Sequence, residues 1–135
     1  MEAQWRVLIC DDSLGFPTLV QTWLRDDPRF EPIGVAKNGA NVRRLVAEQL
    51  PDLLVLDLLL PDTPEPAELV GALRASHPAL RILLVSSLQT EALGEAARAV
   101  GADGFCTKGA PADELTARLY AVASGEGSST QNRLP

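Results

Sequence analysis

The chain has 135 residues, of which 46% are hydrophobic and 22% charged, a composition typical of one globular domain and unlike that of disordered chains. Its 18 acidic residues outnumber its 12 basic ones, and the net charge of -6 argues against direct binding to nucleic acid. The N-terminus lacks the pattern of a leader peptide and no apolar stretch reaches the roughly 18 residues of a membrane span, so we expect a cytoplasmic protein without membrane contact.

The first third of the chain alternates between strand and helix patterns. Residues 5–10 form a short apolar run that predicts a strand, and apolar side chains at helical spacing follow over residues 16–24. Residues 30–36 predict a second strand, in which Pro32 indicates a sheet edge because proline cannot donate to a ladder. A second helical stripe covers residues 42–50.

The alternation continues to the end of the domain. Residues 53–60 are almost uninterrupted apolar side chains around Asp57, as expected for a central strand covered on both faces. A loop with three prolines follows at residues 61–66. Further helix and strand patterns then alternate over residues 69–73, 80–85, 93–100, 103–107 and 115–123.

Five βα units with short connections predict an α/β fold, a doubly wound five-stranded parallel sheet with five helices. The flavodoxin-like strand order 2-1-3-4-5 follows if Pro32 marks an edge and residues 53–60 form the central strand. We expect the domain to span residues 1–124. Residues 125–135, rich in glycine and serine at their start, are expected to be a flexible tail or a truncated linker.

Residues suited to phosphoryl chemistry stand at the ends of four predicted strands. Asp11 and Asp12 follow the first strand, Asp57 belongs to the third, Ser86 follows the fourth and Lys108 the fifth. In a doubly wound sheet, ligands bind outside the carboxyl ends of the strands, where the strand order reverses. Three crowded carboxylates repel one another, and a hard divalent cation such as Mg²⁺ relieves that repulsion. The pattern therefore predicts a metal-binding cleft.

Each of these groups also has a purely structural interpretation. An Asp-Asp pair before a helix more often caps the helix, Ser86 at a strand end can belong to a turn, and Lys108 can be a solvated surface residue. Phe105 is an ordinary core residue by composition. Asp57 is harder to dismiss, because a carboxylate among so many leucines is costly without a partner or water.

The joint pattern resembles the receiver domain of two-component response regulators. The acid pair, single acid, hydroxyl and lysine occur in that order, Pro61 follows Asp57 by four residues, and the likeness covers about residues 5 to 124. Residues 101–111 further resemble the NarL/FixJ subfamily of transcription regulators, where a DNA-binding helix-turn-helix usually follows the receiver. The resemblance implies a phosphoacceptor module that receives a phosphoryl group from a sensor histidine kinase and is not itself an enzyme.

The resemblance also implies how the acidic cleft works. Asp57 corresponds to the phosphoacceptor, and Mg²⁺ is the implied cofactor. Asp12 and Asp57 would ligate the metal directly, Asp11 mainly through water, and the backbone carbonyl of Leu59 occupies the position of the remaining protein ligand.

The remaining implied roles concern the product and its readout. Lys108 and Ser86 would hold phosphoryl oxygens, and Ser86 would move together with Phe105 to switch the partner surface. Because phenylalanine lacks a hydroxyl, such a switch would act through packing alone. The family also implies a homodimer through the fourth helix, fifth strand and fifth helix.

The chain departs from the family pattern around the cleft. Glu65-Pro66 stands where the family commonly has a glycine, which predicts a reshaped and stiffened loop. Leu59 and Leu88 are apolar at positions where many receivers carry polar side chains. They flank the path of a hydrolytic water in the family, so we expect both residues to slow dephosphorylation.

Other functions fit the pattern less well. A phosphorylation-independent interaction module on the same fold is the first alternative, and the complete set of site residues argues against it. A nucleotide-binding enzyme would need a G-x-G-x-x-G or P-loop motif after a strand, and this sequence has neither. An aspartyl-phosphate hydrolase would need an acid two residues after Asp11, where Ser13 stands.

Overall fold

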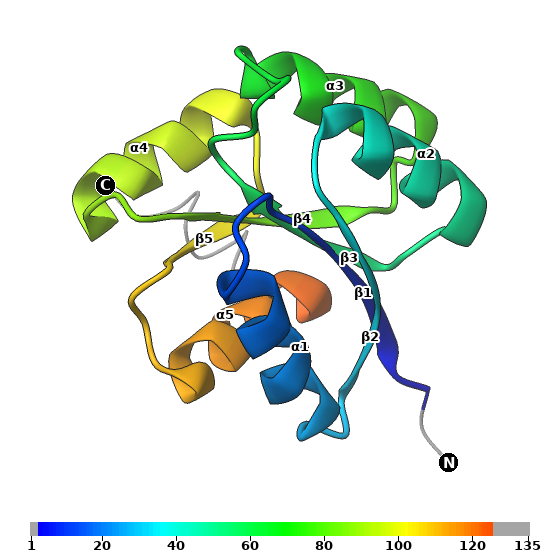
Figure 1. The fold of residues 1–135 in the computed structure, drawn as a ribbon, viewed down its shortest axis with the longest axis vertical. Helices are drawn as coiled ribbons and strands as arrows, with labels where there is room; N and C mark the ends of the chain where they lie inside the picture. The colour runs from blue at the N-terminus through cyan, green and yellow to red at the C-terminus, as the bar shows by residue number, and fades with distance from the viewer. Residues whose placement is uncertain (1–2, 126–135) are drawn as a thin grey trace.

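The computed structural model describes residues 3–125, in which strands and helices alternate strictly (Figure 1). The strands are β1 (Trp5–Cys10), β2 (Phe30–Ala36), β3 (Leu53–Asp57), β4 (Arg81–Ser86) and β5 (Gly104–Thr107). The helices are α1 (Phe16–Arg25), α2 (Gly39–Gln49), α3 (Pro66–Ser76), α4 (Thr90–Val100) and α5 (Ala112–Ser124). Apart from Gly125, the predicted tail lies outside the described residues.

All five strands form one parallel sheet in the order β2-β1-β3-β4-β5, which confirms the predicted topology. Pro32 lies in the edge strand β2, where its missing N–H removes no hydrogen bond from a central strand. Helices α1 and α5 cover one face of the sheet, and α2, α3 and α4 cover the other (Figure 1). The strand order reverses between β1 and β3, which are direct neighbours.

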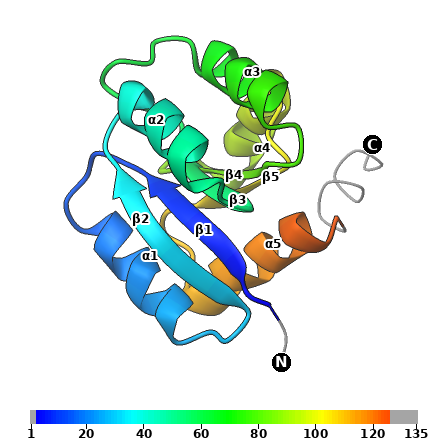
Figure 2. The same ribbon diagram turned by 90° about the vertical axis from the view of Figure 1, so that its right-hand side faces the viewer.

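Alternate residues of each strand enter two different cores, because successive side chains of a strand point to opposite faces. In β3, Leu54 and Leu56 pack with α2, α3 and α4, whereas Leu53 and Val55 pack with α1 and α5. All five residues of β3 are buried, which explains why apolar and polar residues do not alternate along this strand. The sheet is thus a rigid support whose carboxyl edge faces the viewer in Figure 1 and points to the left in Figure 2.

The third strand is shorter than predicted. β3 ends at Asp57, and residues 58–60 belong to the loop. The amide of Leu58 still donates to the carbonyl of Val85 (2.9 Å), but Leu59 is 73% exposed, and Leu60 forms an isolated bridge with Thr63. In the sequence, the run of leucines extends past the end of β3 into the loop at the edge of the sheet. The residue types therefore do not mark the end of the strand, which is visible only from the exposure of Leu59 in the structure.

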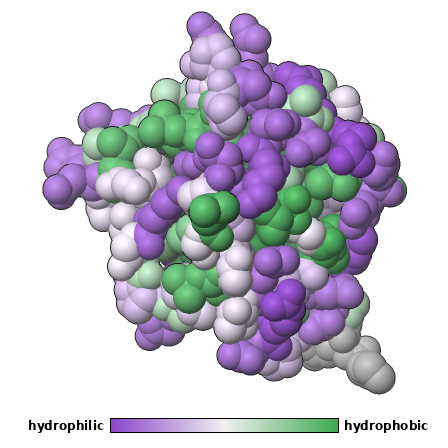
Figure 3. All heavy atoms as spheres, in the orientation of Figure 1, coloured by the Kyte–Doolittle hydropathy of each residue, from purple (hydrophilic) through white to green (hydrophobic). Residues whose placement is uncertain are grey.

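Glycine and proline lie at helix ends in this fold. Gly101 closes α4 in the left-handed region (φ 84°), a conformation that glycine adopts easily. Pro111 precedes the first residue of α5 and occupies its N-cap position. Within residues 3–125, none of the helices is long and apolar enough to cross a membrane. The face shown in Figure 3 is a mosaic in which apolar groups are separated by hydrophilic ones.

Candidate functional site

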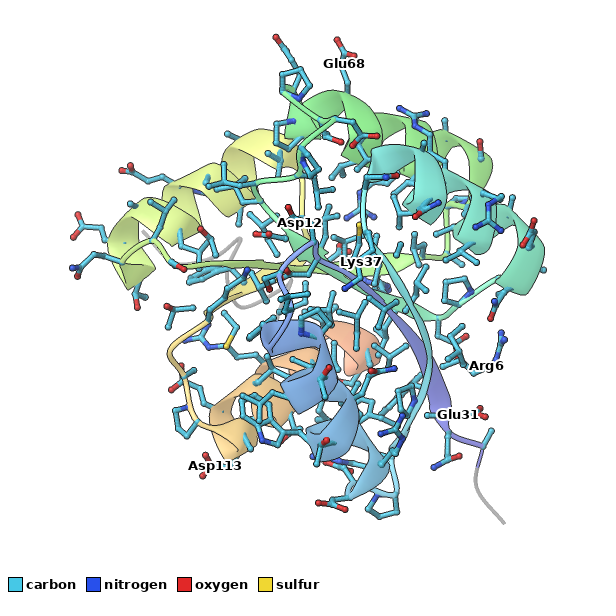
Figure 4. The ribbon with its side chains drawn as sticks, in the orientation of Figure 1. Arg6, Asp12, Glu31, Lys37, Glu68 and Asp113 are labelled. Carbon is cyan, nitrogen blue, oxygen red and sulfur yellow. The ribbon has the colours of Figure 1, made fainter. Side chains whose placement is uncertain are left out.

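The carboxyl ends of four neighbouring strands carry the predicted site residues. Asp57 and Ser86 are the last residues of β3 and β4. Asp11 and Lys108 lie just beyond β1 and β5, and both extend the ladders, since the Asp11 amide donates to Ala36 (2.9 Å) and the Lys108 amide to Ser86 (2.9 Å). Asp12 follows in the β1–α1 loop, near the centre of the face seen in Figure 4.

Strand alternation explains which of these groups meet. Asp57 points to the α1/α5 face with Leu53 and Val55, and Asp11 continues the same alternation in β1, as Lys108 does in β5. One carboxylate oxygen from each of Asp11, Asp12 and Asp57 lies within 4.8 Å of the others. The structure therefore brings the three predicted carboxylates together.

Asp11 is fully buried and does not cap a helix. Its Oδ1 accepts hydrogen bonds from the Ser13 amide (2.8 Å) and hydroxyl (2.6 Å), while the N-cap of α1 is Gly15, which has no side-chain cap. The capping interpretation of the Asp11-Asp12 pair is thus wrong. Ser13 instead holds the Asp11 carboxylate in the site.

Lys108 is the counter-charge of this cluster. Its Nζ lies 2.7 Å from Asp11 Oδ2 and 3.4 Å from Asp57 Oδ2, and it sits 5.1 Å from the centre of the Phe16 ring. Burial lowers the pKa of Lys108, but the two carboxylates outweigh this effect and hold the pKa above its ordinary value. The ammonium group therefore stays charged. The sequence pattern placed Phe16 in an apolar helical stripe and did not indicate its contact with Lys108.

The two buried carboxylates are perturbed in opposite directions. Burial raises the pKa of Asp57, the nearby Asp11 charge adds to this, and the opposing hydrogen bond from the Leu59 amide (3.3 Å) does not cancel it. Burial also acts on Asp11, but Lys108 and Ser13 outweigh it and lower the pKa of Asp11. The site thus combines Asp11, whose ionised form is stabilised by its neighbours, with Asp57, whose ionised form is destabilised by burial.

The donor set suits a hard divalent cation. Within residues 3–125, the buried Asp11 Oδ2 has only the Lys108 ammonium beside it, at 2.7 Å, and accepts from no backbone amide or hydroxyl. A buried acceptor in that state is a feature that a metal ion would satisfy. Together with the carboxylates of Asp12 and Asp57, it forms an all-oxygen cluster of the kind that Mg²⁺ prefers.

The residues expected to read or protect the site surround it. The Ser86 hydroxyl is buried and accepts a hydrogen bond from the Leu88 amide (3.2 Å). Leu59 and Leu88 are 73% and 41% exposed, so both stand in solvent next to the strand ends. Neither side chain is needed for the core.

Phe105 is wedged between two helices. A Cβ on Gly94 of α4 would lie 3.3 Å from the Phe105 ring, and the Arg118 guanidinium of α5 lies 5.1 Å from the ring centre. Arg118 also donates to the Phe105 carbonyl (3.1 Å). The half-buried ring thus joins α4, β5 and α5.

One contact near the site was not predicted from the sequence. Asp62, in the proline-containing loop, accepts hydrogen bonds from the backbone amides of Gly39 (2.7 Å) and Ala40 (3.1 Å) at the start of α2. The only sequence signal is an Asp directly after Pro61, which predicts a turn but says nothing of the distant helix it reaches.

Comparison with known proteins assigns the family. The sequence profile of the response regulator receiver domain matches residues 7–120. The chain belongs to this family. It is a receiver domain, the phosphoacceptor module of two-component signal transduction, and receiver domains are generally dependent on Mg²⁺ and accept phosphoryl groups from histidine kinases.

Solved structures agree with this assignment. The receiver domain of the response regulator NarL from Mycobacterium tuberculosis superposes with a TM-score of 0.82 at 28% identity, over 92% of this chain and 99% of that one. A LuxR-family response regulator from Aurantimonas sp. superposes with a TM-score of 0.81 at 28% identity, over 91% of this chain and 87% of that one. The predicted likeness to NarL-type receivers is confirmed.

Curated relatives share the receiver over part of their length. A protein-glutamate methylesterase/protein-glutamine glutaminase from Myxococcus xanthus is 36% identical over 116 residues, which are 85% of this chain and 32% of that protein. Its counterpart from Methanospirillum hungatei is 35% identical over 105 residues, 76% of this chain and 30% of that protein. The chain spans about a third of these relatives, and the receiver itself is not an enzyme.

Proposed function

We propose that Asp57 of this receiver accepts the phosphoryl group, and that Asp11, Asp12 and the Leu59 backbone carbonyl join it in holding Mg²⁺. The observation that carries the proposal is the cluster itself: the Asp57 carboxylate lies within 4.8 Å of two other carboxylates and 3.4 Å from Lys108. Bound Mg²⁺ would supply a hard positive charge shared by the carboxylates and the phosphoryl oxygens.

The side chains divide the remaining chemistry. An Asp57 carboxylate oxygen attacks phosphorus, and as the new P–O bond forms, the bond from phosphorus to the donor's imidazole nitrogen breaks and the imidazole keeps the electron pair. The Lys108 ammonium neutralises one phosphoryl oxygen, and the Ser86 hydroxyl can donate to another because its present hydrogen bond, from Leu88, uses the hydroxyl as acceptor.

The surroundings set the lifetime and the readout of the signal. Leu59 and Leu88 shield the phosphoryl group from water and slow its hydrolysis. Movement of Ser86 toward the phosphoryl group changes the packing of Phe105, and through its contacts with Gly94 and Arg118 this reshapes the surface of α4, β5 and α5. That surface is the proposed homodimer interface.

The partner and setting follow from the receiver family. A sensor histidine kinase is the proposed donor, the cytoplasm is the proposed compartment, and direct contact of this segment with nucleic acid or membrane is not expected. Residues 125–135 would serve as a tail or a truncated linker.

The proposal is tested by incubating the protein with acetyl phosphate and Mg²⁺ and measuring its intact mass. We expect one phosphoryl group on the wild type, none on Asp57→Asn, and none when a chelator removes the metal. An unmodified wild type would overturn the proposal and favour a phosphorylation-independent interaction module on the same fold.

A further inference from the structure

The loop between β3 and α3 is held at three points. At its start, the Leu58 amide donates to the Val85 carbonyl of β4 (2.9 Å). Leu60 is buried in the core, and its carbonyl accepts from the Thr63 amide (3.2 Å). Further along, Asp62 accepts from Gly39 (2.7 Å) and Ala40 (3.1 Å) of α2. Leu59, whose carbonyl belongs to the proposed metal site, lies between the first of these contacts and the other two.

Asp62 completes the N-terminus of α2. The first amides of a helix have no partner within the helix and need one outside it. In α2, the Asn41 amide donates to the Asn38 side chain (2.8 Å) and the Val42 amide to the Asn38 carbonyl (3.0 Å). Asp62 accepts from the two amides that remain, so its carboxylate is oriented by both oxygens and favoured by the helix dipole.

A small residue at position 39 leaves room for this contact. A Cβ at Gly39 would lie 2.5 Å from Thr63 Oγ1 and 3.1 Å from Asp62 Oδ1, so both side chains would have to shift. The Thr63 hydroxyl in turn donates to Asp62 Oδ1 (2.9 Å), so a shift of either side chain disturbs the contact with α2. Gly39 is therefore favoured by close approach and not by an unusual backbone angle.

Beyond the buried Leu60, few contacts join this part of the loop to the rest of the domain. A hollow of about 270 Å³ lies beside the contact, lined by Arg43, Glu68 and Leu69 together with the loop. Pro61 and Pro64 have no N–H, so the loop has few backbone donors of its own. The loop backbone makes the internal hydrogen bond from Thr63 to Leu60, whereas the Asp62 side chain supplies the hydrogen bonds that join the loop to α2.

We propose that Asp62 is a positioning residue: by anchoring the β3–α3 loop to α2, it fixes the backbone at Leu59 and so sets the affinity of the acidic cluster for Mg²⁺. This inference rests on the proposed metal site. Residues that orient a metal ligand without touching the metal commonly change affinity by 10-fold or more when removed. We expect Asp62→Ala to weaken Mg²⁺ binding about 10-fold, at the lower end of that range.

The test compares Mg²⁺ affinity, measured by calorimetry, in Asp62→Ala, Asp62→Asn and Glu65→Ala. Glu65 is exposed and is the N-cap residue of α3, but its side chain makes no capping hydrogen bond, so its removal costs the same charge without affecting the anchor. Asn keeps one acceptor oxygen and is expected to restore part of the affinity. Hydrogen exchange of the Gly39 and Ala40 amides in the metal-free protein should accelerate in Asp62→Ala and stay unchanged in Glu65→Ala.

A second route removes the contact from the helix side. Gly39→Ala should weaken Mg²⁺ binding as Asp62→Ala does, and the double variant should be no weaker than either single one. Equal affinities in Asp62→Ala, Asp62→Asn and Glu65→Ala would overturn the positioning role and leave only a charge effect. If the wild type binds no Mg²⁺, the proposed metal site fails, whereas normal wild-type binding with an unaffected Asp62→Ala refutes only the anchor.

Discussion

Replacing Asp57 by asparagine is expected to stabilise the metal-free domain, although Asp57 stands at the centre of the site. Asp57 is 6% exposed, and burial is the largest cause of its raised pKa. A carboxyl group whose pKa is raised by folding holds its proton more tightly in the folded chain, so its ionised form opposes folding. Asparagine keeps the shape, and its oxygen can still accept from the Leu59 amide.

The size of the effect follows from the neighbouring charges. Lys108 lies 3.4 Å from Asp57, and the Asp11 carboxylate lies within 4.8 Å. With an effective dielectric constant of about 20, these contacts are worth about −5 and about +3.5 kcal/mol. Asp12 is exposed and adds a weaker repulsion. The attraction of Asp57 to Lys108 and its repulsion from Asp11 and Asp12 nearly cancel, so they do not offset the cost of burying the Asp57 charge. We therefore expect Asp57→Asn to raise the free energy of unfolding by about 1–2 kcal/mol at pH 7.

Urea unfolding in the presence of a chelator, followed by the fluorescence of Trp5 and Trp23, measures this change. The advantage of Asp57→Asn should be complete above the raised pKa of Asp57 and disappear as the pH falls through it, because the wild type then becomes neutral too. Asp11→Asn should behave oppositely. Its carboxylate has a lowered pKa, so the variant loses stability at neutral pH, and the deficit closes as acid protonates Asp11 in the wild type. An Asp57→Asn variant that is less stable than the wild type, with an unchanged denaturant slope, would refute this reasoning.

Three further outcomes are expected. Leu59→Asn should lose its phosphoryl group several-fold faster than the wild type, because the exposed Leu59 no longer shields it; an unchanged or slower rate, measured by phosphate release, would contradict this. Lys108→Met should lower the free energy of unfolding by about 3 kcal/mol, since it leaves the fully buried Asp11 without a cation, whereas Lys37→Met at an exposed position should stay within about 0.5 kcal/mol in the same urea experiment. In sedimentation, a phosphoryl mimic with Mg²⁺ should double the mass of the domain if α4, β5 and α5 form the dimer face, and an unchanged mass would exclude that interface.

Much of the fold was predictable because its signals are local. Alternating strand and helix patterns gave the five units, and Pro32 identified the edge strand. The neighbouring positions of Asp11, Asp57 and Lys108 followed from topology, since parallel strands bring their carboxyl ends to one edge. Strand periodicity then predicts which side chains share a face.

The remaining features depend on distances that no local pattern contains. Sequence alone could not show that β3 ends at Asp57, because the leucines continue and only their exposure changes. It also could not show that Lys108 lies closer to Asp11 than to Asp57, or that Asp62 reaches α2. Both depend on the paths of loops, which are set by packing between segments far apart in the chain.

The contact between Gly39 and Asp62 constrains how this domain can diverge or be recombined. A side chain at residue 39 would displace the Thr63 and Asp62 side chains, so a larger residue there disturbs the contact between the loop and α2. A chimera that receives this loop should keep the Asp62 contact best if glycine begins the second helix. We therefore expect residues 39 and 62 to be inherited as a pair, although 22 positions separate them in the chain.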